Sequence, residues 1–207
     1  MTQFDTVELN NTFYRLPEES VFAAWRAHAR RGFVYSLKAS RYLTHMRKLT
    51  APEQPLQLFF ERARELRSSL GPVLYQLPPR FDVNLPRLRA FLQALPPRRR
   101  HVVEMRDERW YRDDVFDLLN EHKVALCLHD MAGSAAPRRQ VGPFIYLRFH
   151  GPLRYRGSYS DDALARWADW LASRAAAGTE GYVYFNNDID AAAPHDARRL
   201  LDMLAAR

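Results

Sequence analysis

Short apolar runs with β character recur along the whole chain, and each ends in polar or ionisable residues. Valine, isoleucine and aromatic residues are frequent in these runs, as is typical of strands. The runs cover residues 4–7, 33–37, 73–75, 102–103, 124–128, 145–149 and 182–185. The pattern predicts about seven strands. Parallel βα folds place their sites at the carboxyl ends of such strands, so we expect the functional groups there.

Helical periodicity fills the intervals between the predicted strands. One predicted helix spans about 52–70, and the others begin near Pro17, Asn84, Asp113, Ser160 and Pro194. Asn84 and Ser160 are residue types that cap helix N-termini. Strands that alternate with helices predict an α/β fold. No fixed-period repeat and no low-complexity linker interrupts the pattern, so we expect a single domain over residues 1–207.

The strand count favours a barrel. The commonest closed arrangement of parallel βα units has eight strands, and the first is the one expected to be absent, because the chain opens almost directly in a strand at Phe4. We therefore expect a TIM-barrel-like (β/α) barrel that is incomplete at its N-terminus and open, through a misassigned start site or a shortened chain. The alternative is an open doubly wound sheet, but no glycine-rich phosphate loop follows any predicted strand.

The net charge of the chain bears on which kind of ligand it attracts. The formal net charge is +7, and lysine occurs only at Lys38, Lys48 and Lys123, so arginine supplies nearly all of the positive charge. The charges are dispersed and accompany no nucleic-acid motif. This favours attraction to small anions.

Cysteine content and hydropathy narrow the cellular context. Cys127 is the only cysteine, so an internal disulfide is impossible, and its apolar run predicts a buried thiol. No apolar stretch approaches the roughly 20 residues that span a bilayer, and the first residues lack the features of a signal peptide. We expect a cytoplasmic protein without a membrane partner.

Several sequence blocks resemble the DUF72 family, also called YecE-like proteins. These blocks are Thr6–Tyr14, Ser36–His45, Leu74–Pro79, Glu104–Arg106 with Trp110, Tyr146–Gly151 and Tyr182–Asp188. They run through the whole chain in the family's order. The resemblance implies a TIM-barrel-like fold and no established activity. The chain departs from the family in lacking the usual first strand and helix, and in having Ala191–Ala193 where a glycine-containing turn is more usual.

Polar residues at the predicted strand ends make up the candidate site. The candidate catalytic residues are Glu104, His129, Asp130 and His150. The candidate substrate-binding residues are Glu8, Asn10, Tyr14, Lys38, Gln76, Arg106, Arg148, Tyr155, Asn186 and Asn187. Carboxylates and imidazoles transfer protons near neutral pH, lysine and arginine hold anions, and amides bind hydroxyl groups. The set predicts an isomerase, lyase or hydrolase that acts on a small anionic or polyhydroxylated substrate.

Other interpretations of the same residues stay open. A divalent metal held by Glu8, Glu104, Asp130 and one of the two histidines is an alternative, although no HxH or HExxH pair occurs and the cofactor stays unassigned. A nucleic-acid or nucleotide binding module would use the arginines, with the aromatic side chains of Tyr14, Trp110 and Tyr155 as stacking surfaces. His45 is interpreted as a hydrogen-bonding loop residue rather than a catalytic base.

Overall fold

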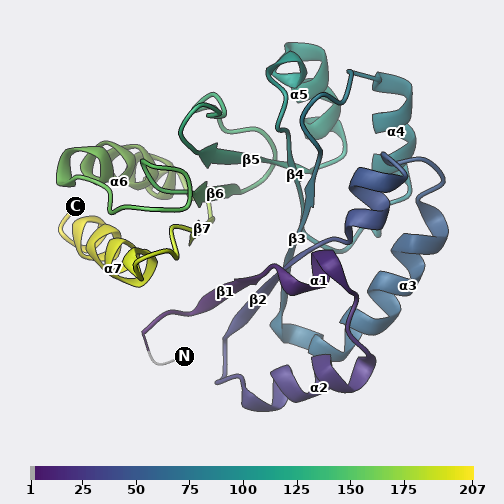
Figure 1. Cartoon of the computed structure of the whole chain (residues 1–207), viewed down its shortest axis with the longest axis horizontal. Coiled ribbons are helices and arrows are strands. Elements are labelled where there is room, and N and C mark those ends of the chain that lie inside the picture. The colour runs from purple at the N-terminus through teal and green to yellow at the C-terminus, as the bar shows by residue number, and fades with distance from the viewer. Residues whose placement is uncertain (1–2) are drawn as a thin grey trace. The chain divides into compact units, whose positions relative to one another are not determined.

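The computed structural model describes residues 3–207, and the chain divides into two compact units, Met1–Val124 and Ala125–Arg207. The strands within each unit pair in parallel, with helices on one face (Figure 1). The predicted α/β class is therefore confirmed. The single domain over residues 1–207 stays a prediction, and each unit is described by itself.

Unit 1 (Met1–Val124), as described from residue 3 onward, contains four parallel strands and five α-helices. The strands are β1 (Thr6–Leu9), β2 (Val34–Lys38), β3 (Leu70–Gln76) and β4 (His101–Glu104). The helices are α1 (Asn11–Tyr14), α2 (Glu19–His28), α3 (Glu53–Ala63), α4 (Leu85–Gln93) and α5 (Asp113–Glu121). A π-helical turn, η1 (Tyr42–Met46), and two 3₁₀ segments, η2 (Arg64–Ser69) and η3 (Glu108–Trp110), complete the unit.

Unit 2 (Ala125–Arg207) contains three parallel strands and two long helices. The strands are β5 (Ala125–Asp130), β6 (Ile145–Phe149) and β7 (Gly181–Phe185). The helices are α6 (Asp161–Ala176) and α7 (Ala192–Ala205), which pack against each other. Aromatic contacts join α6 to its sheet, because the ring of Phe149 meets the ring of Trp167 edge-on at 5.5 Å.

Within each unit, neighbouring strands follow one another in chain order. Unit 1 pairs β1 with β2, β2 with β3 and β3 with β4, and unit 2 pairs β5 with β6 and β6 with β7. A doubly wound sheet reverses its strand order at a switch point, and neither sheet does so. The winding is that of a barrel-type fold, as predicted. In unit 1, β1 is less buried than β2, with which it pairs, and in unit 2, β7 is less buried than β6.

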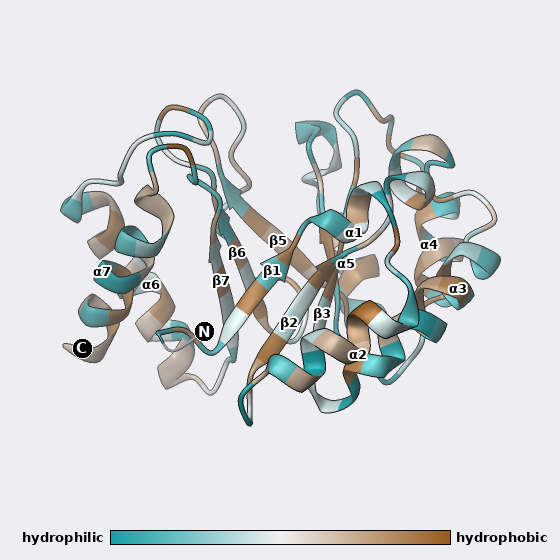
Figure 2. Ribbon diagram, turned by 60° about the horizontal axis from the view of Figure 1, so that its bottom comes forward, coloured by the Kyte–Doolittle hydropathy of each residue, from teal (hydrophilic) through white to brown (hydrophobic). Residues whose placement is uncertain are grey.

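The local signals explain most element boundaries. The side chain of Asn84 accepts a hydrogen bond from the backbone N–H of Arg87, and that of Ser160 accepts one from Ala163, so both predicted caps are confirmed. Two buried stripes anchor α3 and α5 to the core, and Figure 2 shows the helices divided between hydrophobic and hydrophilic residues. The buried position of Cys127 is likewise confirmed.

The predicted helix over residues 52–70 is wrong in its second half. The α-helix ends at Ala63, a 3₁₀ segment follows, and Arg67 leaves helical geometry at φ 52° and ψ −122°. Gly71, which directly follows the predicted helix, lies inside β3. A Cβ atom there would lie 2.3 Å from the side chain of Val34, so the glycine allows β2 and β3 to approach closely.

Across residues 3–207, the structure contains no helix with the length and apolar character needed to span a membrane.

Candidate functional site

The sheet of unit 1 separates a polar face from a helix-covered face. The register aligns Glu8 with Ser36, Lys38 with Leu74, and Gln76 with Glu104. Because side chains alternate along a strand, Glu8, Lys38, Gln76 and Glu104 share one face. The intervening residues face the helices. Tyr35 donates a hydrogen bond to the carbonyl of Trp25 in α2, and the ring of Tyr75 packs on Phe91 of α4. Four predicted site residues are thus gathered on one surface.

Glu104 is the most deeply buried of these groups, with a side chain that is 0% exposed. One carboxylate oxygen, Oε1, lies 2.5 Å from Nε of Arg106, whose side chain is 9% exposed. The other, Oε2, accepts a hydrogen bond of 2.9 Å from Nε2 of Gln76. Burying a charge is costly unless it is paired and hydrogen-bonded, and both conditions are met. The structure therefore brings two predicted site residues, Gln76 and Arg106, to the carboxylate of a third, Glu104.

Lys38 reaches the same face from the end of β2. Its side chain is largely buried, and Nζ lies 4.1 Å from the ring centroid of Phe13, a cation–π contact. Thr12 donates a hydrogen bond of 2.7 Å to the carbonyl of Lys38, which fixes α1 over the strand end. Thr12 and Phe13 are supporting residues that the sequence interpretation missed, although their position directly after a strand was the available signal.

His45 belongs with these residues rather than in a remote loop. The hydroxyl of Thr44 lies 2.9 Å from its Nδ1, and its ring meets Phe13 edge-on at 5.0 Å. Burial lowers the pKa of His45, the positive charges of Lys38 and Arg41 lower it further, and Glu104 opposes them. The imidazole is therefore neutral at neutral pH and able to accept a proton. We call Lys38, His45, Gln76, Glu104 and Arg106 the Glu104 cluster.

The remaining predictions for unit 1 have different outcomes. Asn10 precedes α1, and its carbonyl accepts a hydrogen bond from Phe13. Tyr14 is 71% exposed and is open to a ligand. Trp110 is only 1% exposed, and its indole N–H donates to the carbonyl of Phe81 at 2.6 Å. Trp110 is therefore a packing residue, and the alternative in which it stacks on a base is wrong.

Unit 2 gathers a second set of predicted residues. The register places His129 beside Arg148, and both are buried on one face of the sheet. Nε2 of His129 lies 3.1 Å from the hydroxyl of Ser134. The ring of His150 lies 6.4 Å from that of His129 and 5.5 Å from that of Tyr155, which is 41% exposed. Two imidazoles, a guanidinium and a phenol are therefore brought together.

Asp130 faces away from this set. It follows His129 in β5, so its side chain points to the opposite face of the sheet. There its Oδ2 accepts a hydrogen bond of 3.1 Å from the indole N–H of Trp167 in α6. The structure assigns the carboxylate of Asp130 to holding the helix and does not bring it to the imidazoles.

Asn187 serves a loop rather than an open surface. Its Nδ2 donates to the carbonyl of Gly157 and to Oδ2 of Asp196, both at 2.9 Å. Asp196 is fully buried in α7 and also accepts hydrogen bonds from Ser158, Tyr159 and Arg199. The backbone N–H of Asn186 donates to the carbonyl of Phe149 at 2.7 Å. The loop 151–159, which carries Tyr155, is therefore anchored to α7.

The metal alternative finds no preassembled ligand set. In the part of the chain that the structure describes, no three or more His, Cys, Asp or Glu side chains are grouped so that they could hold a metal ion. Metal binding by Glu8, Glu104, Asp130 and a histidine stays a prediction.

Many surface arginines are already paired with carboxylates. Such pairs include Arg30–Asp5, Arg62–Glu18, Arg89–Glu121, Arg112–Asp114 and Arg207–Asp169. Exposed pairs of this kind contribute little to stability, but they reduce the positive charge available to a polyanion. The net charge of +7 therefore overstates the attraction at these places.

Parallel βα units wound in chain order, with polar groups on the sheet face opposite the helices, define an α/β protein of the barrel type. The chain belongs to the DUF72 family, described as a protein of unknown function, and the family model matches residues 1–207. The resemblance noted in the sequence is confirmed. None of the curated proteins matches the chain.

Solved structures of the same family share the fold. A DUF72 family protein of Thermotoga maritima MSB8 is 24% identical, with a TM-score of 0.84 over 98% of this chain and 85% of that chain. A DUF72 family protein of Enterococcus faecalis V583 is 18% identical, with a TM-score of 0.84 over 99% of this chain and 91% of that chain. At this level of identity the similarity shows the fold alone.

Proposed function

We propose that this protein is an enzyme that carries out acid–base chemistry on a small anionic or polyhydroxylated substrate bound at the Glu104 cluster. Isomerase, lyase and hydrolase reactions all draw on such chemistry.

The observation that carries the proposal is the burial of Glu104 between Arg106 and Gln76. A buried ion pair is often no more stabilising than apolar side chains of the same volume. Buried ionisable groups held on a polar face are therefore candidates for function rather than for stability alone. The neighbouring Lys38 and His45 add a second cation and an imidazole whose lowered pKa keeps it neutral at neutral pH.

Each member of the cluster has a defined task in this proposal. Lys38 and Arg106 attract the anionic group of the substrate, because both carry donors suited to carboxylate or phosphate. Gln76 binds hydroxyl groups. Glu104 and His45 exchange protons with the bound molecule. In unit 2, His129 and His150 stay predicted proton-transfer residues, and Arg148 and Tyr155 stay predicted binding residues.

The alternative, a nucleic-acid or nucleotide binding module, has weaker support. One of its three stacking residues, Trp110, is buried, and many surface arginines are engaged with carboxylates. A nucleic-acid complex would lose affinity steeply with salt and would survive the loss of Glu104.

A ligand screen followed by substitution tests the proposal. Small carboxylic acids, polyols and sugar phosphates are screened by thermal shift, and each hit is incubated with the protein and followed by proton NMR for conversion. We expect Lys38→Met and Arg106→Met to weaken binding of a hit about tenfold each, the loss of one charge-assisted contact. We expect Glu104→Gln to bind the hit and fail to convert it.

The matched control is Glu121→Gln, which removes an exposed carboxylate that pairs with Arg89. It is expected to bind and convert the hit as the parent protein does. The proposal is wrong if Lys38→Met and Arg106→Met bind every hit normally, or if Glu104→Gln converts the hit at the parent rate.

A further inference from the structure

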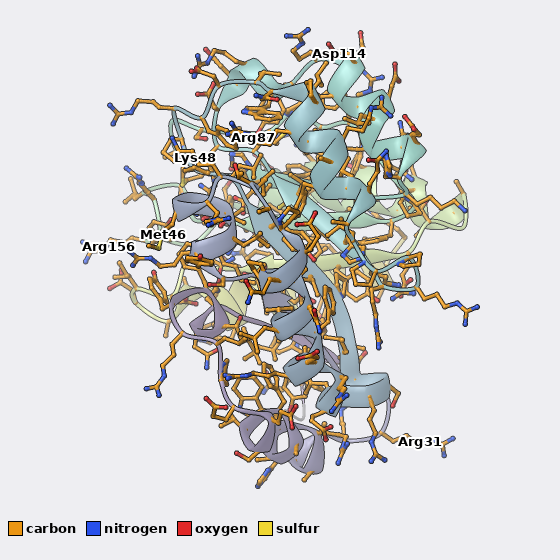
Figure 3. The ribbon with its side chains drawn as sticks, turned by 90° about the vertical axis from the view of Figure 1, so that its right-hand side faces the viewer. Arg31, Met46, Lys48, Arg87, Asp114 and Arg156 are labelled. Carbon is orange, nitrogen blue, oxygen red and sulfur yellow. The ribbon has the colours of Figure 1, made fainter. Side chains whose placement is uncertain are left out.

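Two cations of unit 1 converge on one aromatic ring outside the Glu104 cluster. Nζ of Lys48 lies 5.8 Å from the ring centroid of Phe81, and the guanidinium carbon of Arg87 lies 5.9 Å from the same centroid. The two side chains come from different segments, one after β2 and one at the start of α4. Figure 3 shows Lys48 and Arg87 in the same part of the unit.

Neither charge is paired with a carboxylate. Among residues 3–207, no carboxylate oxygen lies within 4.0 Å of the side-chain nitrogens of Lys48 or Arg87. The nearby carboxylates of Asp82 and Asp107 both pair with Arg109. Two residues further along α4, Arg89 does have a carboxylate partner, Glu121. Like charges held together without a counterion create a local positive potential that concentrates anions.

The ring on which the cations converge is held in place. Phe81 is only 4% exposed, packs on Trp110 at 5.4 Å, and accepts the indole hydrogen bond of Trp110 at its carbonyl. The ring that the two cations share is therefore fixed by its packing.

We propose that Lys48 and Arg87 bind the phosphate group of a small phosphorylated molecule. An arginine fork and a lysine ammonium offer several N–H donors to the oxygens of one phosphate. Both segments follow carboxyl ends of strands, β2 and β3, whose last residues Lys38 and Gln76 belong to the Glu104 cluster. The inference rests on the proposed function for the reaction, because it makes the substrate of that cluster a phosphate ester. Lys48 and Arg87 then hold its phosphate, and Lys38 and Arg106 bind another polar group of the same molecule.

Binding is tested by titrating the full chain at low ionic strength with inorganic phosphate, ribose 5-phosphate and ribose, using calorimetry and thermal shift. We expect both phosphates to bind and ribose to bind more weakly than its phosphate. Lys48→Met and Arg87→Leu are each expected to weaken phosphate binding about tenfold. A normal melting curve for each variant confirms that it folds.

Two matched controls remove the same charge elsewhere in unit 1. Arg31→Leu and Lys123→Met are exposed and lie outside the proposed site, and Figure 3 shows Arg31 at the opposite end of the view from Lys48. We expect both to bind phosphate within about twofold of the parent, since weak long-range attraction is all that they lose. An equal loss in the controls would overturn the proposal, because net charge would then explain the binding.

Further outcomes separate this inference from its alternatives. The proposal is overturned if phosphate gives no shift, or if single-stranded oligothymidine binds through Arg87 while ribose 5-phosphate does not. It is supported if Glu104→Gln still binds ribose 5-phosphate with the parent affinity. If that variant also converts phosphorylated substrates normally, the proposed role of Glu104 fails while the phosphate site stands.

Discussion

The side chain of Glu104 is fully buried. Its contacts with Arg106 and Gln76 offset the hydration that the carboxylate loses on folding. Removing one partner of such a pair leaves the other charge buried and unpaired, whereas removing both leaves no buried charge. This asymmetry distinguishes a true ion pair from two polar residues that happen to lie close together.

A double-mutant cycle measures the Glu104–Arg106 pair. We expect Glu104→Gln and Arg106→Met each to lower the free energy of unfolding by about 3–5 kcal/mol, and the double variant to lose clearly less than the sum. Urea unfolding gives the values. The exposed pair Arg89–Glu121 is the control, and its single variants should each cost about 1 kcal/mol or less. Additive losses at Glu104 and Arg106 would contradict the pairing.

His101 makes stability depend on pH. Its Nε2 lies 2.9 Å from the carbonyl of Pro96 and its Nδ1 3.2 Å from the hydroxyl of Tyr75, with the ring of Phe60 at 5.9 Å. Burial lowers the pKa of His101, the charge of Arg99 lowers it further, and the Pro96 hydrogen bond opposes both. The pKa of a histidine in the unfolded chain is about 6.5. Between this value and the lower pKa of the folded chain, the unfolded chain binds a proton at His101 and the folded chain does not.

We therefore expect the stability from this residue to be complete above about pH 6.5 and to fall as the pH drops towards the lower, folded pKa. Urea unfolding between pH 5 and 8 measures the slope. His101→Gln should flatten the slope, although His45, whose pKa is also lowered, keeps part of it. A slope that His101→Gln leaves unchanged would refute this assignment.

At the scale of elements, the turn after β6 depends on the small size of Gly151. Its φ is +80°, and a Cβ atom would lie 2.5 Å from the carbonyl oxygen of Arg156. Gly178, between α6 and β7, has a similar φ of +78° with no atom within 4 Å. The two glycines therefore share the backbone conformation and differ only in crowding.

Substituting alanine at both positions separates these effects. We expect Gly178→Ala to cost about 1 kcal/mol, the strain of a left-handed alanine, and Gly151→Ala to cost a further ~1–3 kcal/mol from the clash. Thermal or urea unfolding measures both. Equal costs would mean that the loop shifts freely, and the loop 151–159 would then be less fixed than its hydrogen bonds indicate.

The same loop depends on Asp196. Asp196→Ala removes an acceptor shared by the donors of Ser158, Tyr159, Asn187 and Arg199, and we expect a loss of about 3 kcal/mol or more. Trypsin should then cut faster at Arg154 and Arg156 in the loosened loop. Asp202→Ala, an exposed residue of the same helix, is the control. Unchanged cleavage at Arg154 and Arg156 would contradict the anchoring role.

At the scale of the whole molecule, the fold could be predicted because buried parallel strands are apolar along their length. The boundaries of β1 could not, because this edge strand is half-buried throughout and includes the charged Glu8. The end of helical geometry at Arg67 could not be predicted either, because the helical spacing of apolar residues continues past it from Leu66 to Leu70. Periodicity reports which side chains are buried, and it does not report backbone dihedral angles.

The candidate site was predicted in part. Lys38, Gln76, Glu104 and Arg106 were named because polar groups at strand ends are conspicuous. The separation of Asp130 from His129 was available from the sequence, because adjacent strand residues face opposite sides. The burial of Asp196 could not be predicted, because an aspartate in a helix pattern normally lies on the surface. Only the loop 151–159 buries it.

The single buried thiol, Cys127, allows unfolding to be measured by alkylation. Cys127 lies in β5 with no exposed surface, so an alkylating reagent reaches it only when unit 2 opens. The rate of labelling then measures the opening equilibrium of that unit without an introduced probe. If phosphate bound by the unit 1 residues Lys48 and Arg87 slows the labelling of Cys127, the two units unfold as one cooperative body. If the rate stays the same, each unit opens independently.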